Sequence, residues 1–138
     1  MSQLEVDKVI PQSGTNLQIG EAGDTINLTT ATVNLQTGVG GTAWQAIKTA
    51  NFTAVAGEGY FVNTTGGVIT ATLPASATIG NEVSIIDYAG TADTNNITIG
   101  RNGHNIQGAA SDLVVSTERA AFTLVYVDST QGWLLKDK

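Results

Sequence analysis

The chain has 138 residues and a formal net charge of −6, with six basic side chains against twelve acidic ones and no cysteine. This length fits one globular domain with a small appendage. The basic residues are scattered singly, which excludes nucleic acid as the main partner. The absence of cysteine excludes disulfides and thiolate metal sites.

No apolar run approaches the length of a membrane span, so we expect no membrane insertion. The first ten residues carry neither the basic nor the apolar region of a secretory signal, so we expect the chain to be cytosolic when made. Thr, Gly and Asn are frequent and charged residues make up only 13% of the chain. This composition, with many short runs that alternate apolar and polar residues, predicts an all-β protein.

Residues 1–42 are expected to form a separate N-terminal β segment. Thr25-Ile26-Asn27-Leu28 recurs as Thr32-Val33-Asn34-Leu35, and the segment has no aromatic residue. Its apolar positions are too few to bury a core within one chain, so we expect them to stack on identical chains as a stalk or anchor. In similar viral shafts the copies come from two other chains around a three-fold axis, which implies a trimer. The alternative is two strands of one small sheet lying on the main domain. The predicted trimer-interface positions are Leu17, Ile19, Ile26, Leu28, Val33 and Leu35.

Residues 43–138 are expected to form a β-sandwich-like knob, because every Trp, Tyr and Phe of the chain lies there. Turn signals at regular spacing predict strands at 44–49, 51–56, 59–63, 68–73, 82–87, 96–100, 113–116, 120–127 and 133–136. Asn102-Gly103 favours a tight type I′ hairpin. The core is predicted to contain Leu73, Val83, Ile85, Ile97, Ile99, Val114, Leu124 and Trp133.

Side chains suited to catalysis are few. His104, the single histidine, follows the predicted Asn102-Gly103 turn, where we expect a solvated polar residue. Glu82, Asp87 and Asp93 are the candidate carboxylates for glycoside hydrolysis. Glu82 and Asp87 bracket one strand and would lie roughly 16 Å apart, beyond the roughly 5–9.5 Å that glycosidases require. We therefore expect no enzymatic activity, no cofactor and no metal.

Aromatic side chains are the remaining candidates for binding, because flat apolar rings stack on sugars. Tyr60, Tyr88, Trp44 and Trp133 are the residues of this kind. Alternation places Tyr60 and Phe61 on opposite faces of one strand, so one of them is expected to be exposed. Tyr60 and Tyr88 are the predicted glycan contacts.

Several segments resemble, in the same order, the C-terminal domains of tail-fibre and virion-appendage proteins of tailed phages, notably marine and cyanobacterial ones. They read NFTAVAGEGYFVNTT at 51–65, ITATLPA at 69–75, IDYAG at 86–90, TNNITIGRNG at 94–103, and LVYVD at 124–128 followed by Gly132-Trp133. The opening, from Val6 through PQSGT at 11–15 to AGDTI at 22–26, is similar to segments that precede such heads.

The resemblance implies a non-enzymatic structural protein of a bacteriophage virion, assembled in the host cytoplasm as a homotrimer whose N-terminal β segment is attached to the particle. Only about 43 residues precede the head, so the chain resembles a head fibre or a capsid or neck decoration more than a long tail fibre. The implied partners are capsid, neck or tail proteins. The alternative function is a glycan-binding receptor-recognition module at a tail-fibre tip, which would attach to a host surface glycan.

Overall fold

A computed structural model of the protein describes residues 41–136, which belong to the unit Gln36–Lys138. These residues form two β-sheets, which confirms the predicted all-β class. The one helical element in this part of the chain is a 3-10 turn at Thr64–Gly66. All six predicted trimer-interface positions, from Leu17 to Leu35, lie outside the described residues.

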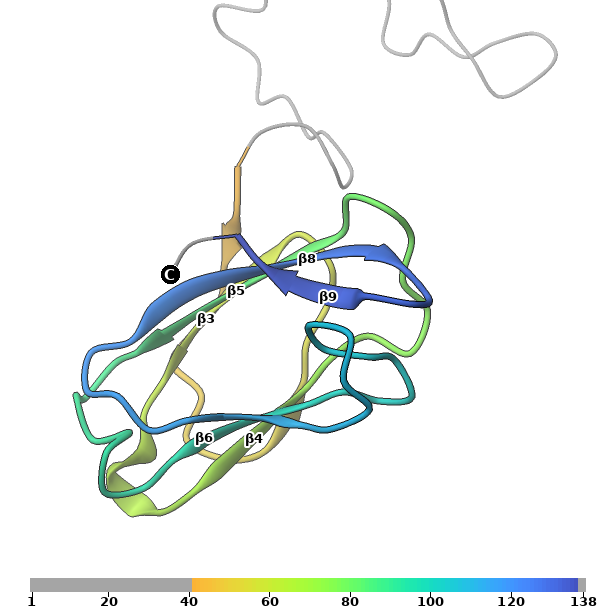
Figure 1. Ribbon diagram of the computed structural model, residues 1–138. Coiled ribbons are helices and arrows are strands. Elements are labelled where there is room, and N and C mark those ends of the chain that lie inside the picture. The colour runs from red at the N-terminus through yellow and green to blue at the C-terminus, as the bar shows by residue number, and fades with distance from the viewer. Residues whose placement is uncertain (1–40, 137–138) are drawn as a thin grey trace, which may run out of the picture. The chain divides into compact units, whose positions relative to one another are not determined.

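Nine strands make up the two sheets (Figure 1). The larger sheet contains, in spatial order, β1 (Ala43–Trp44), β3 (Glu58–Val62), β5 (Glu82–Asp87), β8 (Ala121–Asp128) and β9 (Gly132–Leu135). The smaller sheet contains β2 (Phe52–Thr53), β4 (Ile69–Thr72), β6 (Ile97–Gly100) and β7 (Leu113–Val115). The first two strands are shorter than the predicted 44–49 and 51–56, and beyond β1 only Lys48 makes a single bridge, to Val62.

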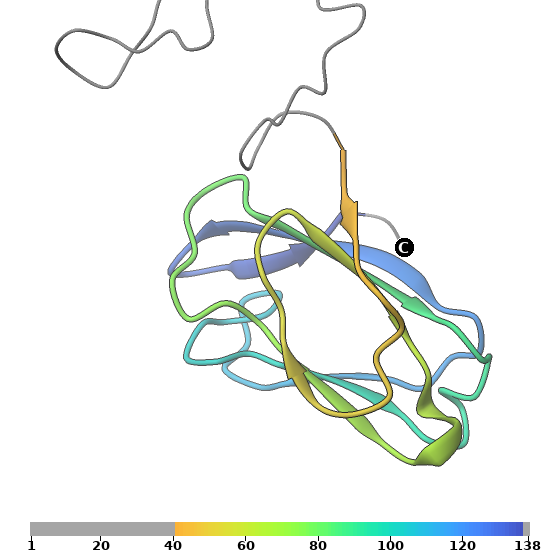
Figure 2. The same ribbon diagram turned by 180° about the vertical axis from the view of Figure 1, so that it is seen from behind.

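The chain winds back and forth between the sheets. The strands β1, β3 and β5 pair in parallel in the larger sheet, and β2, β4 and β6 pair in parallel in the smaller one. Parallel neighbours need a long crossover connection, and here a strand of the opposite sheet supplies it. We call the segments 43–57, 58–81 and 82–112 the first, second and third windings. The first winding is the orange and yellow loop seen from behind in Figure 2.

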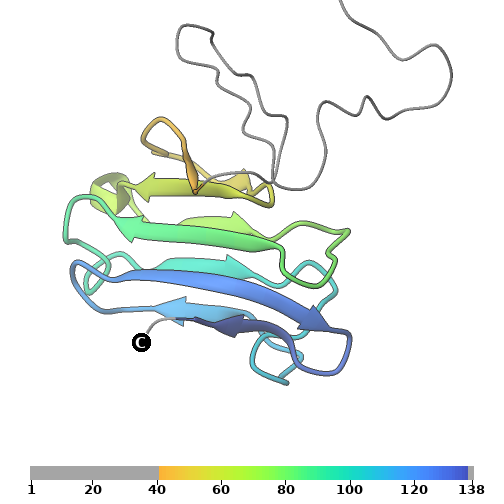
Figure 3. The same ribbon diagram turned by 90° about the horizontal axis from the view of Figure 1, so that it is seen from above.

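The C-terminal strands end this winding pattern. β7 pairs antiparallel with β6, β8 with β5, and β9 with β8. Figure 3 shows the larger sheet from its outer side, with β8 running against β5. The third winding is therefore covered by antiparallel strands, whereas the first winding has no further strand beside it among the described residues.

Alternation along the strands builds the core between the sheets. Seven of the eight predicted core residues are buried there. Val114 is the exception and the prediction was wrong, because it is exposed on β7. On this edge strand the neighbouring Leu113 and Val115 turn toward the core, so Val114 faces outward.

The predicted Asn102-Gly103 turn forms, but the hairpin does not. Both residues have positive φ, 47° and 90°, and the His104 amide donates to the Arg101 carbonyl at 3.0 Å. β6 then pairs with β7, which begins only at Leu113. The turn therefore opens a longer loop, in which Ile106 bridges to Ala109 and Trp133.

Charging the core is expected to destabilise the protein strongly. Ile85 is 1% exposed and Ile79 is 79% exposed, so the same substitution at these two isoleucines compares a buried site with an exposed control. Ile85→Asp should lower the free energy of unfolding by about 3–5 kcal/mol, because an unpaired charge is buried. Ile79→Asp should change it by less than about 0.5 kcal/mol. Chemical denaturation measures both, and equal effects of the two substitutions would contradict this core.

Candidate functional site

The outer face of the larger sheet carries an aromatic pair that originates in two windings. In β3, Tyr60 and Val62 are buried, so Gly59 and Phe61 face outward. Trp44 of β1 is paired with Gly59, and Phe61 is paired with Ile86 of β5. The Trp44 and Phe61 rings are stacked, with centroids 4.9 Å apart and planes inclined by 28°.

Gly59 provides the space in which the Trp44 ring lies. A Cβ atom at this position would be 2.6 Å from Cε3 and 2.7 Å from Cζ3 of Trp44. The same Cβ atom would be 2.5 Å from Cγ2 of Thr42, so any other residue would displace Thr42 and the indole. Trp44 remains 47% exposed although one side of its ring system packs against β3.

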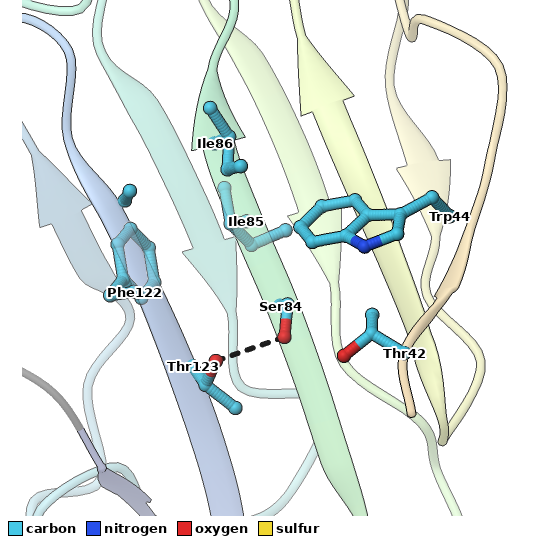
Figure 4. A pocket seen from close by; sticks show the side chains of 8 residues that line it. Thr42, Trp44, Ser84, Ile85, Ile86, Phe122 and Thr123 are labelled. Carbon is cyan, nitrogen blue, oxygen red and sulfur yellow. Dashed lines mark hydrogen bonds between the residues drawn. The ribbon is translucent and has the colours of Figure 1, made fainter. Parts of the chain in front are cut away.

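A shallow hollow of about 250 Å³ lies beside this ring (Figure 4). In Figure 4 the indole extends from β1 across β3 toward Ser84 of β5. The Ser84 and Thr123 hydroxyls lie 2.9 Å apart and share a hydrogen bond between β5 and β8. None of the residues around the hollow is ionisable: they are Thr42, Trp44, Ser84, Ile85, Ile86, Ala121, Phe122 and Thr123.

The two predicted glycan contacts are not brought together. Tyr60 is 2% exposed and packs against Phe52, with ring centroids 4.6 Å apart, so the prediction for Tyr60 was wrong. Its hydroxyl donates to the Glu58 carboxylate and accepts from the Val55 amide at 2.8 Å. Alternation indicated that Tyr60 and Phe61 face opposite sides but not which of them is buried.

Tyr88 is exposed, as a surface contact requires, but it does not line the hollow. It directly follows β5, and its carbonyl accepts a hydrogen bond from the Arg119 guanidinium at 2.7 Å. Trp133 is fully buried and its ring edge packs on Tyr126, so it is a core residue.

The carboxylates of β5 stand at its two ends, as predicted. Glu82 pairs with Lys136 at 3.2 Å. Asp87 is buried, and its carboxylate accepts hydrogen bonds from the backbone N–H groups of Gly90, Thr91, Ala92 and Arg119. The Asp87 carboxylate therefore joins the loop after β5 to the loop before β8. Asp93 is exposed in the first of these loops.

His104 is less solvated than its place after a turn suggested. Its Nε2 lies 3.0 Å from the Ala75 carbonyl, and its ring meets Tyr126 edge-on at 5.1 Å. Within residues 41–136, no group of three or more His, Cys, Asp or Glu side chains is placed to hold a metal ion. No helix in the same range is long and apolar enough to cross a bilayer.

Sequence reasoning considered Trp44 but missed the residues that make its surroundings. Gly59 interrupts the alternation of β3, and a glycine inside a strand is a signal for close approach of another group. Ser84 and Thr123 carried no such signal, because their pairing depends on strand order. No protein-family model matches the chain, and no curated protein matches it.

Burial raises the pKa of Tyr60 from 10.0 to about 12, and the hydrogen bond to Glu58 adds to this shift. The folded chain thus keeps a proton that the unfolded chain loses at lower pH. The associated stability is fully present below pH 10 and is lost as the pH rises toward 12. In the Tyr60→Phe variant, the free energy of unfolding should fall less steeply between these two pH values, as measured by denaturation.

The matched control is Tyr88→Phe, which removes an exposed phenol and should leave the loss of stability intact. If Tyr60→Phe lost stability with pH as steeply as the unmodified chain, the buried, protonated phenol would be refuted.

Proposed function

We propose that this chain is a non-enzymatic structural protein of a phage virion. In this proposal, residues 1–42 form a trimeric β stalk or anchor that attaches to capsid, neck or tail proteins. Residues 43–138 form the β-sandwich-like head that projects from the particle. The all-β architecture of residues 41–136 and the order of the phage-like segments support this reading.

The observation that carries the proposal is the side of the first winding beside which residues 41–136 place no further strand. Its strands β1 and β2 are each two residues long and form one edge of each sheet. The apolar residues Ile47 and Val55, which follow these strands, are exposed. Uncovered strand edges and exposed apolar side chains invite pairing with another chain.

Sister chains would cover this side in a homotrimer. Gly41, the first described residue, lies two residues before β1, the edge strand of the first winding. Beside the third winding the sheets continue with β7, β8 and β9 and end at the longer edge strands β7 and β9. The two-residue strands of the first winding are therefore the edges at which sister chains would add most to a short fibre or decoration.

We expect the purified full chain to sediment as a trimer, at three times the chain mass of 14.2 kDa. Replacing Ile26 and Leu28 together by Ser should dissociate the trimer, because the stalk would lose part of its shared apolar stripe. The head should keep its far-UV circular dichroism. Sedimentation velocity at micromolar concentration measures the mass.

A wild-type chain that sediments as a monomer would contradict the homotrimer. The virion location has its own test, which is immunogold labelling of intact particles. Labelling of the particle surface is the expected result, and consistent absence of label from particles that infect normally would contradict it.

A further inference from the structure

We propose that the hollow beside Trp44 binds an uncharged sugar unit of a polysaccharide chain. The site goes beyond the structural role proposed above and requires no other chain. Its elements are an exposed indole, a pair of neighbouring hydroxyl groups and a lining without charges, brought to one sheet face by the pairing of β1, β3, β5 and β8.

The indole is held in a position that suits stacking. Trp44 packs over Gly59 and against Phe61, so its orientation is set by the sheet and not by solvent. The remaining 47% of its surface is turned outward. The C–H groups on one face of a pyranose ring pack on such an aromatic surface, and a ring that is already ordered loses little entropy on binding.

The hydroxyl groups supply partners for the polar rim of the sugar. Each hydroxyl offers one donor and two acceptor positions. The hydrogen bond between Ser84 and Thr123 uses one donor and one acceptor of the pair. Ser84 is 7% exposed and Thr123 is half-buried, so Thr123 is the more accessible of the two to a ligand. Thr42 adds a third hydroxyl-bearing side chain to the lining. A few polar groups beside an apolar surface are the usual composition of a small-ligand site.

The charge of the site indicates an uncharged ligand. No ionisable side chain lines the hollow. Glu82, which faces the same side of the sheet as Ser84, is already paired with Lys136. A carboxylated or sulfated sugar would lose hydration here without gaining a counter-charge. The shallow form of the hollow fits a sugar unit within an extended chain, whose neighbours remain in solvent.

The test measures binding of soluble hexasaccharides to the full chain by isothermal titration calorimetry. The neutral probes are hexamers of glucose, galactose, mannose and xylose, and the charged control is a hexamer of galacturonic acid. We expect at least one neutral hexamer to bind and the galacturonate hexamer to bind at least tenfold more weakly. Trp44→Ala should weaken the binding at least tenfold.

The matched control is Val114→Ala, because Val114 is 55% exposed but lies on β7 of the smaller sheet and does not line the hollow. This variant should bind like the unmodified chain, and Ser84→Ala should bind with intermediate affinity. Circular dichroism verifies that each variant is folded.

Three results of the binding measurements would overturn the proposal: no binding of any neutral hexamer at millimolar concentration, equal binding by Trp44→Ala, or equal binding of the charged hexamer. Sedimentation of the Trp44→Ala variant separates this site from the trimer. If this substitution dissociates the assembly, Trp44 is a contact between copies of the chain and the sugar site is refuted. If the chain is a monomer that still binds sugar through Trp44, only the trimer is refuted.

Discussion

Parallel in-register pairing of β1, β3 and β5 is the constraint on which both faces of the larger sheet depend. Because successive windings supply neighbouring strands, residues of the same orientation line up across the sheet. On the inner face this alignment stacks Tyr60 beside Ile85 and Val62 beside Asp87. On the outer face it places Gly59 beside Ser84, which is in turn opposite Thr123. A shift of one residue in any pair would exchange the two faces and destroy the core and the hollow together.

Two polar groups on this sheet serve the fold rather than the surface. The buried Asp87 carboxylate joins two loops through backbone N–H groups, and buried Tyr60 joins Glu58 to the amide of Val55. Buried polar groups are tolerated when they are satisfied in this way. The proposed sugar site lies on the outer sheet face, where Trp44 is held against Phe61.

The period-2 pattern of the sequence predicted the strands and most of the core, because alternation is a local property of each strand. It failed at Val114, since burial on the edge strand β7 depends on which face meets the other sheet. It also left open which of Tyr60 and Phe61 is buried, and the choice of Tyr60 as a surface contact was wrong. The position of Trp44 over Gly59 results from pairing between two windings, and the sequence contains no local signal for that register. The predicted stalk positions, from Leu17 to Leu35, stay predictions.

Nuclear magnetic resonance tests the register of the windings most directly. The Gly59 hydrogen that occupies the place of a Cβ lies against Cε3 and Cζ3 of the Trp44 six-membered ring, whose ring current displaces the resonance. The predicted result is a Gly59 Hα resonance that is strongly displaced and returns to an ordinary position in the Trp44→Ala variant. A Gly59 Hα resonance at the same ordinary position in both proteins would contradict the pairing of β1 with β3 and, with it, the site beside Trp44.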